Sequence, residues 1–326
     1  MPNTLAQIAT ALREAQCVAL AAHVRPDGDA IGSIVALGHS LHLAGKTVYI
    51  LSEDGVPSNL AFLPGSERVV QSVAKPLALD VAVALDTATK ERLGERTNIA
   101  FSAAPILVNV DHHGTNPQYG HLNHIDTSSP ATGQIIYELI TQEQFPADDL
   151  IRQNLFAAIS SDTGSFQFSS TTPRTHRIIA EMMEAGLDAA TLSQHLYHEH
   201  PLRRILLLKA LLNEMKLSAD HKIASWALTM AAQEAIGMEP GDTEGLIDHL
   251  RTIQGVTAAV IFEEISGGKV RISARSKDES LDVSKVCALF GGGGHRMAAG
   301  ARLPGPMADA ETQFLESLKN EIERIS

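Results

Sequence analysis

A histidine and two aspartates stand within the stretch HVRPDGD, residues 23–29. His23, Asp27 and Asp29 follow a short apolar run, residues 17–22, which predicts a buried strand. Acids this close repel one another, and burial penalises each ionised carboxylate further. A divalent cation relieves both costs, because it accepts carboxylate oxygen and neutral imidazole nitrogen together. The stretch therefore points to metal binding at the end of a strand.

Acids and histidines also close other apolar segments of the chain. The further candidates are Asp86 after residues 80–85, the triplet Asp111, His112 and His113 after residues 105–110, and Asp162 at the end of residues 154–162. Ligands of open α/β sheets gather outside the carboxyl ends of the strands. We therefore expect these side chains to converge in one pocket.

Each of these residues has an ordinary alternative explanation. Asp27-Gly28 alone is most often a turn, Asp29 alone a helix N-cap, and a lone His23 a satisfied histidine near a core. Independent turns and caps have no reason to recur as acids after several segments in order. The recurrence favours a functional cluster.

A carboxylate count this high predicts two ions, about 3.5–4 Å apart, that share a bridging carboxylate. Mixed histidine and carboxylate ligation without thiolate favours manganese or a similar first-row metal over structural zinc. Ligand softness alone does not choose among manganese, iron, cobalt and magnesium. Such a pair of ions can ionise a water and hold a phosphoryl oxygen.

The elements that must position these residues alternate between strand and helix. Continuously apolar runs at residues 17–22, 46–51, 80–85 and 105–110 predict strands that are covered on both faces. The apolar periodicity of residues 31–43, with a stop at Gly45, predicts a helix, and further helices follow Pro130. The expected fold class is α/β, with an N-terminal parallel sheet that carries helices on both faces.

The pattern of apolar and polar residues changes from about residue 216. Strands are predicted at residues 222–230, 255–265 and 269–276, with a hairpin turn at Gly267-Gly268 and short helices between them. We expect an N-terminal domain over residues 1–187, a helical linker over 188–215, and a smaller C-terminal α/β domain over 216–326.

A glycine run, Gly291–Gly294, lies in the smaller domain. Without Cβ atoms, this backbone could expose successive N–H groups as a nest for phosphate, although a bare tetraglycine is more often a flexible loop. His295 and Arg296 after the run, and Arg275 in the predicted strand, favour phosphate binding.

The formal net charge of −12 argues against long nucleic acid as a partner, because such binding draws on many Lys and Arg contacts. The longest apolar runs fall far short of the roughly 18 residues of a membrane span. The N-terminal residues lack the pattern of a signal peptide. We expect a cytoplasmic protein that handles phosphates in a small local pocket.

These residues resemble the motifs of the DHH phosphoesterase superfamily. Four segments of this chain are similar to the four motifs, in the same order: HVRPDGDAIGS to the first, ALDTAT to the second, VDHHGTN to the third and ISSDTGSFQFSS to the fourth. The segments ISARSK and FGGGGHRMAAG are similar to the DHH-associated C-terminal domain, which supplies substrate contacts. The resemblance covers nearly the whole chain.

The resemblance implies a role for each candidate residue. One metal would be held by His23, Asp27 and Asp86, and the other by Asp29, Asp86, His112 and Asp162, with Asp86 bridging. His113 would face the substrate phosphate, and Asp111 would orient the site or take part in acid–base chemistry. Substrate contacts would come from Arg275, Ser276, Gly292, Gly293, Gly294, His295 and Arg296.

Within the superfamily, the compact two-domain form resembles the nanoRNase group. The resemblance implies a manganese-dependent hydrolase, with magnesium or cobalt as alternatives, that cleaves short oligoribonucleotides to nucleoside monophosphates by in-line attack of an activated water on phosphorus. Dephosphorylation of 3′-phosphoadenosine 5′-phosphate (pAp) is a further expected activity. Two alternatives stay open: a soluble phosphodiesterase of linear or cyclic signalling dinucleotides, and a non-catalytic nucleotide-binding protein.

Whether the chain forms a homodimer stays open as well. An exposed apolar face of a helix such as Ile135–Ile140 is a candidate contact, but helical periodicity does not separate an interface from a core.

Overall fold

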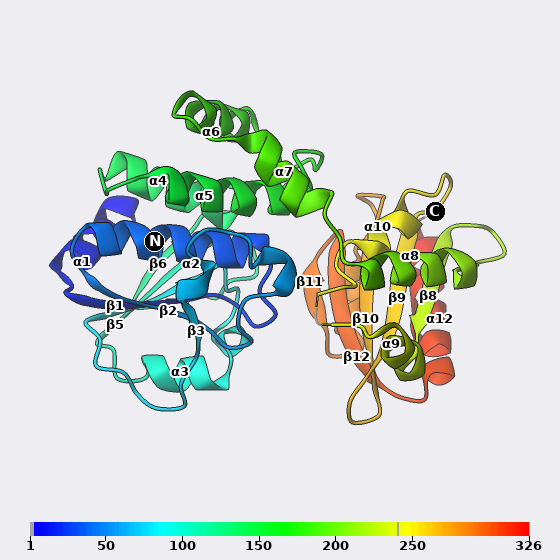
Figure 1. Cartoon of the computed structure of the whole chain (residues 1–326). Coiled ribbons are helices and arrows are strands. Elements are labelled where there is room, and N and C mark those ends of the chain that lie inside the picture. Colours follow the sequence, from blue (N-terminus) through cyan, green and yellow to red (C-terminus); the bar gives the residue numbers. More distant parts are fainter. Residues whose placement is uncertain (1–2, 240, 326) are drawn as a thin grey trace. The chain divides into compact units, whose positions relative to one another are not determined.

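The computed structural model describes residues 3–239 and 241–325. The chain forms two compact units, Met1–Glu199 and His200–Ser326 (Figure 1). The division falls between α7 and α8, the two helices of the segment expected as a linker. Leu192 of α7 belongs to the core of the first unit, and Leu207 of α8 to a core of the second.

The first unit is built on a six-stranded sheet in the order β3-β2-β1-β4-β5-β6. Every pairing in it is parallel, which confirms the predicted fold class. The strands are β1 (Cys17–Ala21), β2 (Thr47–Ser52), β3 (Val69–Gln71), β4 (Val81–Leu85), β5 (Ile106–Asp111) and β6 (Leu122–Ile125). Strand order reverses between β1 and β4, the position where ligands bind in sheets of this kind. The outer strands β3 and β6 escaped the sequence analysis because they are short and partly exposed.

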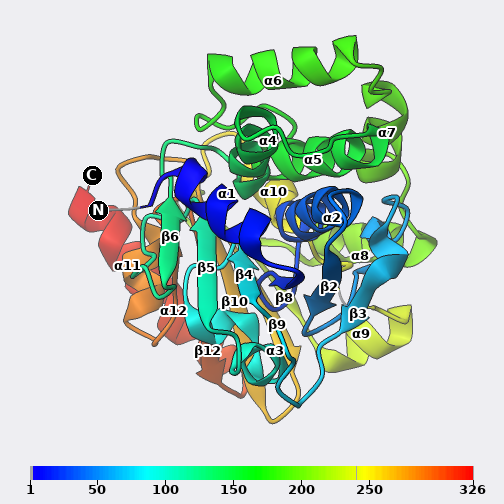
Figure 2. The same cartoon turned by 90° about the vertical axis from the view of Figure 1, so that its left-hand side faces the viewer.

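Helices cover both faces of this sheet, as Figures 1 and 2 show. The first unit contains α1 (Leu5–Glu14), α2 (Gly28–Leu43), α3 (Glu95–Phe101), α4 (Thr132–Gln142), α5 (Asp149–Asp162), α6 (Pro173–Glu184) and α7 (Ala189–Tyr197), with short 3₁₀ turns η1 (Ser58–Leu60), η2 (Ser66–Arg68) and η3 (Lys90–Leu93). The larger core packs α1, α2, α4 and α5 on one face, and α3 packs on the other.

Helix α2 begins earlier than predicted, at Gly28, because the carboxylate of Asp27 caps it. Asp27 Oδ1 accepts the N–H of Ala30 at 3.0 Å. Asp29 therefore lies in the first turn of the helix and does not cap it.

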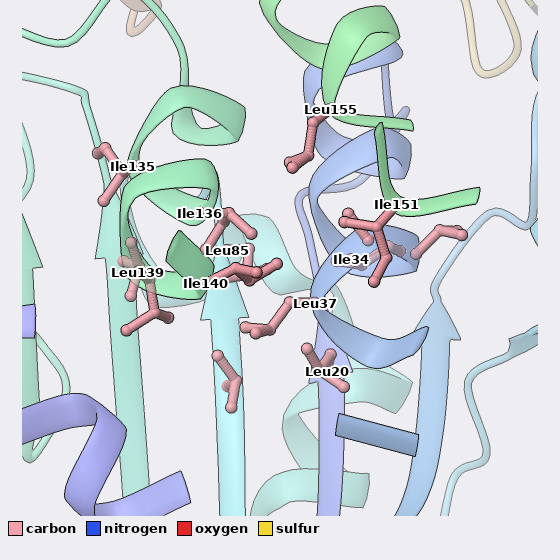
Figure 3. Packing of buried hydrophobic residues seen from close by; sticks show 14 of the residues in the cluster. Leu20, Ile34, Leu37, Leu85, Ile135, Ile136, Leu139, Ile140, Ile151 and Leu155 are labelled. Carbon is pink, nitrogen blue, oxygen red and sulfur yellow. The ribbon is translucent and has the colours of Figure 1, made fainter. Parts of the chain in front are cut away.

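The segment Ile135–Ile140 is part of the core. Ile135, Ile136, Leu139 and Ile140 of α4 are at most 3% exposed and belong to the larger core, in which Ile136 and Ile140 lie beside Leu85 and Leu37 (Figure 3). The apolar stripe faces the sheet and α2, so this segment offers no surface for a dimer contact and the suggestion made from its periodicity was wrong.

The second unit is a mixed six-stranded sheet in the order β11-β12-β10-β9-β8-β7. Its strands are β7 (Lys216–Leu217), β8 (Ile223–Leu228), β9 (Ala258–Ile265), β10 (Lys269–Ser276), β11 (Gly293–His295) and β12 (Ala298–Pro304). Its helices are α8 (Leu202–Glu214), α9 (Met230–Ile236), α10 (Leu246–Arg251), α11 (Val283–Ala288) and α12 (Met307–Ile325). The antiparallel pair β9–β10 confirms the predicted hairpin at Gly267-Gly268.

Helices α11 and α12 pack on one face of this second sheet, and α8 and α10 pack on the other. Among the described residues, no helix combines the length and the apolar character that a membrane crossing needs.

Candidate metal centre

The predicted acids and histidines of the first unit gather at the carboxyl ends of its central strands. His23 follows β1, Asp86 follows β4, and Asp111 is the last residue of β5. Asp162 is the last residue of helix α5, so it does not follow a strand as its place after an apolar run suggested. α2 and α5 pack closely along their lengths, which brings Asp29 and Asp162 to one site.

His23 is fixed in one orientation before any ligand binds. Its Nδ1 lies 2.9 Å from the carbonyl oxygen of Val24, so that nitrogen carries the proton and donates. The other nitrogen, Nε2, lies 3.5 Å from Asp27 Oδ2 and 3.3 Å from Asp86 Oδ2. A backbone carbonyl behind a histidine in this way is the usual arrangement for a metal ligand.

Asp86 lies at the middle of the cluster and is 2% exposed. Its second oxygen, Oδ1, lies 3.5 Å from Nε2 of His112, which in turn lies 3.2 Å from Asp162 Oδ2. The backbone of Asp86 has a φ of 50°, a left-handed conformation that is uncommon outside glycine and is concentrated at functional sites. The two oxygens of Asp86 thus face two different sets of side chains.

Asp29 is 1% exposed and holds the start of α4 as well. Its Oδ2 accepts the N–H of Thr132 at 2.7 Å, and its Oδ1 accepts the N–H of Gly133 at 2.8 Å. Ser33 donates its hydroxyl to the same Oδ1 at 3.1 Å. The N-cap residue of α4, Ala131, has no side chain able to cap, so Asp29 satisfies these two N–H groups from a distant part of the chain.

His113 pairs with the first residue of its own triplet. Its Nδ1 lies 2.7 Å from Asp111 Oδ1, and the second oxygen of Asp111 accepts the Nδ2–H of Asn116 at 2.6 Å. Asp111 is fully buried. This carboxylate therefore orients the His113 ring through Nδ1.

The pKa values of two carboxyl groups, Asp29 and Asp162, show how unfavourable this crowding is for them. Burial raises the pKa of Asp29 well above its usual range, and the charges of Asp86 and Asp162 raise it further. Burial likewise raises the pKa of Asp162 to about 7, with His112 opposing and Asp27 and Asp86 adding to the rise. In the structure, these acids therefore lie close enough to repel one another, as the sequence predicted.

In the metal-free protein, the imidazoles of His23 and His112 supply positive charge beside the carboxylates. Burial lowers the pKa of His112, but hydrogen bonding to Asp86 and the charge of Asp162 outweigh burial and raise it to about 10. His23 behaves alike, because Asp27 and Asp86 outweigh its burial and raise its pKa well above its usual value. Both rings would have to lose a proton to bind a metal ion.

Ligand atoms of these residues form three overlapping groups, within each of which all atoms lie within 4.8 Å of one another. The groups are His23, Asp27 and Asp86; Asp29, His112 and Asp162; and Asp86, Asp111, His112 and His113. Carboxylate oxygens and imidazole nitrogens in this mixture suit divalent cations. The cluster could hold a metal ion.

Thr132 contacts two of the acids and was not anticipated from the sequence. Its N–H donates to Asp29, and its hydroxyl donates to Asp86 Oδ1 at 3.2 Å. A serine or threonine after Pro130 gives no local signal of such a contact, because the two acids lie far away in the sequence.

The glycines Gly28 and Gly32 on α2 also escaped notice as positioning residues. A Cβ at Gly28 would lie 2.5 Å from Ser161 Oγ, and one at Gly32 would collide with the carbonyl oxygen of Asn154. Their four-residue spacing lets α5 approach α2 closely, and it could have been read from the sequence.

The predicted substrate residues of the second unit lie on and beside β10, β11 and β12. Arg275 lies on β10 with its pKa lowered by burial, and Arg296 donates to the carbonyl oxygen of Glu279 at 2.8 Å. Ser276 is fully buried, and its hydroxyl is engaged with the backbone of Asp278. His295 is exposed at the end of β11.

The nest expected over Gly291–Gly294 does not form at its first two residues. The N–H groups of Gly291 and Gly292 donate to the carbonyl oxygens of Ala288 and Cys287, which ends α11. Gly293 and Gly294 pair with β12 as part of the edge strand β11. Gly292 and Gly294 are required for close packing, since a Cβ at either would collide with a carbonyl oxygen of β12, that of Gly300 or Ala298 respectively.

Two family models match this chain, the DHH family N-terminal domain over residues 17–161 and the DHHA1 domain over residues 227–324. A bifunctional oligoribonuclease and PAP phosphatase NrnA from Thermus thermophilus is 32% identical over 94% of this chain and 90% of its own length. The protein of the same name from Bacillus subtilis is 27% identical over 86% of this chain and 87% of its own length.

The fold is also similar to that of solved structures. The crystal structure of an exopolyphosphatase-related protein from Bacteroides fragilis matches with a TM-score of 0.90 at 24% identity, over 98% of this chain and 97% of that one. The motifs, the fold and the relatives agree, and the chain belongs to the DHH phosphoesterase family, as a relative of the NrnA proteins.

Proposed function

We propose that this protein is a metal-dependent hydrolase that degrades short oligoribonucleotides to nucleoside monophosphates and dephosphorylates pAp. The observation that supports it most is the buried cluster in which Asp86 directs one oxygen toward His23 and the other toward His112. Such an arrangement suits two cations that share one carboxylate. The names of the relatives from Thermus thermophilus and Bacillus subtilis supply the substrate class.

We assign one metal ion to His23, Asp27 and Asp86, and the other to Asp29, Asp86, His112 and Asp162. Asp27 and Asp29 flank Gly28 in the sequence, yet they contact different partners. Asp27 faces His23, and Asp29 lies with His112 and Asp162. Manganese is the ion we favour, because the family resemblance implies it and the mixed imidazole and carboxylate donors suit a first-row metal. When bound, two such ions would neutralise phosphoryl oxygens and lower the pKa of a water molecule.

His113 and Asp111 are the residues we assign to proton handling. Asp111 holds His113 through Nδ1, which directs Nε2 away from the carboxylate. His113 can donate a hydrogen bond to a phosphate oxygen or a proton to the departing ribose oxygen, and Asp111 keeps its ring oriented for that role. Asn116 keeps Asp111 in place through the 2.6 Å hydrogen bond to its other oxygen.

In the second unit, we assign substrate contacts to Arg275, His295 and Arg296, with Gly293, where no atom lies within 4 Å of a Cβ position, giving close access to the backbone. Arg275 donates only to its neighbouring carbonyl oxygen of Ala274 in the hydrogen bonds described, which leaves most of its fork for an anion. Ser276 is better explained as a structural residue, because its hydroxyl already holds Asp278.

Product analysis on a small substrate panel tests the proposal. We expect manganese-dependent conversion of 5′-labelled di-, tri- and pentaribonucleotides to monophosphates, and of pAp to AMP. Cyclic di-AMP in the same assay tests the alternative of a signalling phosphodiesterase, which would turn over this compound in preference to the linear substrates. Tight binding of pAp with no product under any metal would show a nucleotide-binding protein and refute the proposal.

A further inference from the structure

Beyond the residues above, one face of the second unit's sheet carries an ordered set of charged and small side chains. β10 and β12 alternate strictly: Val270, Ile272 and Ala274 of β10, with Ala299, Ala301 and Leu303 of β12, join the core that holds α11 and α12. The residues between them therefore project from the opposite face. They are Arg271, Ser273 and Arg275 on β10, and Ala298, Gly300 and Arg302 on β12.

The strand register arranges these residues in rows across the sheet. Arg275 lies opposite Ala298, which lies opposite His295 of β11. Gly300 lies between Ser273 and Gly293 in the next row, so the part of this row on β10, β12 and β11 carries no side chain larger than serine. We call the first the Arg275 row and the second the glycine row.

A third row pairs Arg271 directly with Arg302. Like charges directly opposite each other on neighbouring strands destabilise a sheet. Arg271 is compensated, because its guanidinium forms an ion pair with the buried carboxylate of Glu263 on β9. Arg302 is exposed, and among residues 3–239 and 241–325 its side chain has no ion pair or hydrogen bond.

An unpaired arginine opposite another arginine is unexpected in a chain of net charge −12, where acids are plentiful. The arrangement is favourable once an anion binds, since arginine forks onto phosphate. In the glycine row, no atom lies within 4 Å of the position that a Cβ would take at Gly293, so the backbone there is open to a ribose or a flat base.

We propose that Arg302 binds a backbone phosphate of a linear oligonucleotide whose end is held at the Arg275 row. This inference rests on the proposed function and adds a length requirement to it. Residues 298 and 302 are four positions apart on β12, which corresponds to about 13 Å along the strand. That span exceeds the separation of the 3′ and 5′ phosphates on one nucleoside, so pAp and a dinucleotide do not reach Arg302, whereas a trinucleotide does.

The test compares wild type with Arg302→Gln on pAp, a 5′-phosphorylated diribonucleotide, a triribonucleotide and a pentaribonucleotide with manganese. We expect kcat/KM of the variant to fall about tenfold for the two longer substrates, as for one lost hydrogen bond to a charged group. It should not change for pAp or the dinucleotide. The slope of log kcat/KM against log salt should become shallower by about 0.7 for the longer substrates only.

Two matched variants control for charge and chemistry. Lys319→Gln removes one positive charge from α12, which covers the other face of the sheet, and should leave every substrate unaffected. Arg302→Lys keeps the charge and should recover part of the loss. Arg302→Gln should unfold at the wild-type temperature or above it, because it removes the repulsion with Arg271.

Several outcomes would overturn the inference. They are an equal loss on all four substrates, no loss on the longer ones, or the same loss in Lys319→Gln. If wild type turned over none of the substrates, the proposed function would fall, and fluorescence anisotropy would still decide the role of Arg302. Labelled triribonucleotide should bind wild type more tightly than Arg302→Gln, whereas labelled dinucleotide should bind both equally, and any other pattern refutes the contact.

Discussion

Two helices of the first unit are capped in the same way by carboxylates from elsewhere in the chain. Glu53, after β2, accepts the N–H groups of Arg96 at 3.2 Å and Thr97 at 3.0 Å at the start of α3. Asp29 does the same for the first two N–H groups of α4. In both helices the local N-cap residue provides no side-chain hydrogen bond.

The two carboxyl groups nevertheless differ in their pKa values. Burial raises the pKa of Glu53, but the hydrogen bonds from Thr97 and Arg96 outweigh burial and lower it below its usual value. Burial together with the charges of Asp86 and Asp162 raises the pKa of Asp29 well above its usual value. For Glu53, the two N–H groups of α3 act together with the Arg96 guanidinium and the Thr97 hydroxyl, and these partners account for its lowered pKa. A carboxylate that stays unfavourable despite two N–H donors needs a further positive partner, which a metal ion would supply.

The largest effect is expected from Asp86→Asn. This change removes the one carboxylate that faces both histidines, and we expect the manganese-dependent activity to fall by more than the 10- to 100-fold typical of residues behind a metal ligand. It also removes a charge that raises the pKa of Asp29, so Asp29 should become more like Glu53. Product formation on the labelled dinucleotide measures the first effect. Activity close to wild type would contradict the shared-ligand assignment.

The assignment of neighbouring acids to different ions is tested by Asp27→Asn and Asp29→Asn. We expect each variant to lose one manganese ion and to keep the other with weakened affinity, because Asp27 faces His23 while Asp29 lies with His112 and Asp162. Metal content after dialysis, with isothermal titration of manganese into the metal-free variants, gives the stoichiometry. Identical loss of both ions in both variants would count against the split.

Thr132→Val should lower activity about tenfold, because Asp86 loses the hydroxyl that holds it in place. A tenfold loss is the lower end of the range for residues that orient metal ligands. The hydroxyl of Thr132 is the only group removed, and valine keeps its shape and its N–H to Asp29. Thr132→Ser retains the hydroxyl and should restore most of the activity. A purely structural role would lower the unfolding temperature without changing the manganese concentration required for half-maximal rate, so that concentration is the deciding readout.

The smallest effect on activity is expected from Glu53→Gln, which has no metal-related role. Loss of the charged cap on α3 should cost about 1 kcal/mol of unfolding free energy at pH 7. Asp29→Asn in the metal-free protein should cost less, because the loss of an acceptor is offset by relief from Asp86 and Asp162. Urea denaturation of both variants without metal measures how much unfolding free energy each one loses. A larger loss for Asp29→Asn than for Glu53→Gln would contradict the comparison.

The pH dependence of that difference has a definite sign. The folded pKa of Glu53 lies below the usual value of 4.5, so its contribution is complete above 4.5 and is lost as the pH falls through the folded pKa. Wild type and Glu53→Gln should therefore differ most near neutral pH and converge in acid. A constant difference from pH 7 to pH 3 would show that packing, and not charge, explains the effect.

Sequence reasoning reached most of the metal centre because its residues carry strong local signals. His23, Asp27 and Asp29 follow a strand that is apolar throughout, and parallel strands must end at the same edge of their sheet. Asp162 joins the cluster as predicted, but from the end of a helix and not of a strand. The interpretation of Ile135–Ile140 was wrong because helical periodicity looks the same in a core and at an interface.

The sequence by itself determined the kinds of ligand, their order and the alternation of strand and helix that brings them together. It could do so because side-chain chemistry and hydrophobic period are local properties of the chain. Only the tertiary structure decided that Asp29 caps α4, that Thr132 links two acids, and that Gly291 and Gly292 end a helix. These roles depend on contacts between segments far apart in sequence, and a carboxylate or an N–H group shows no preference among such partners until the chain has packed.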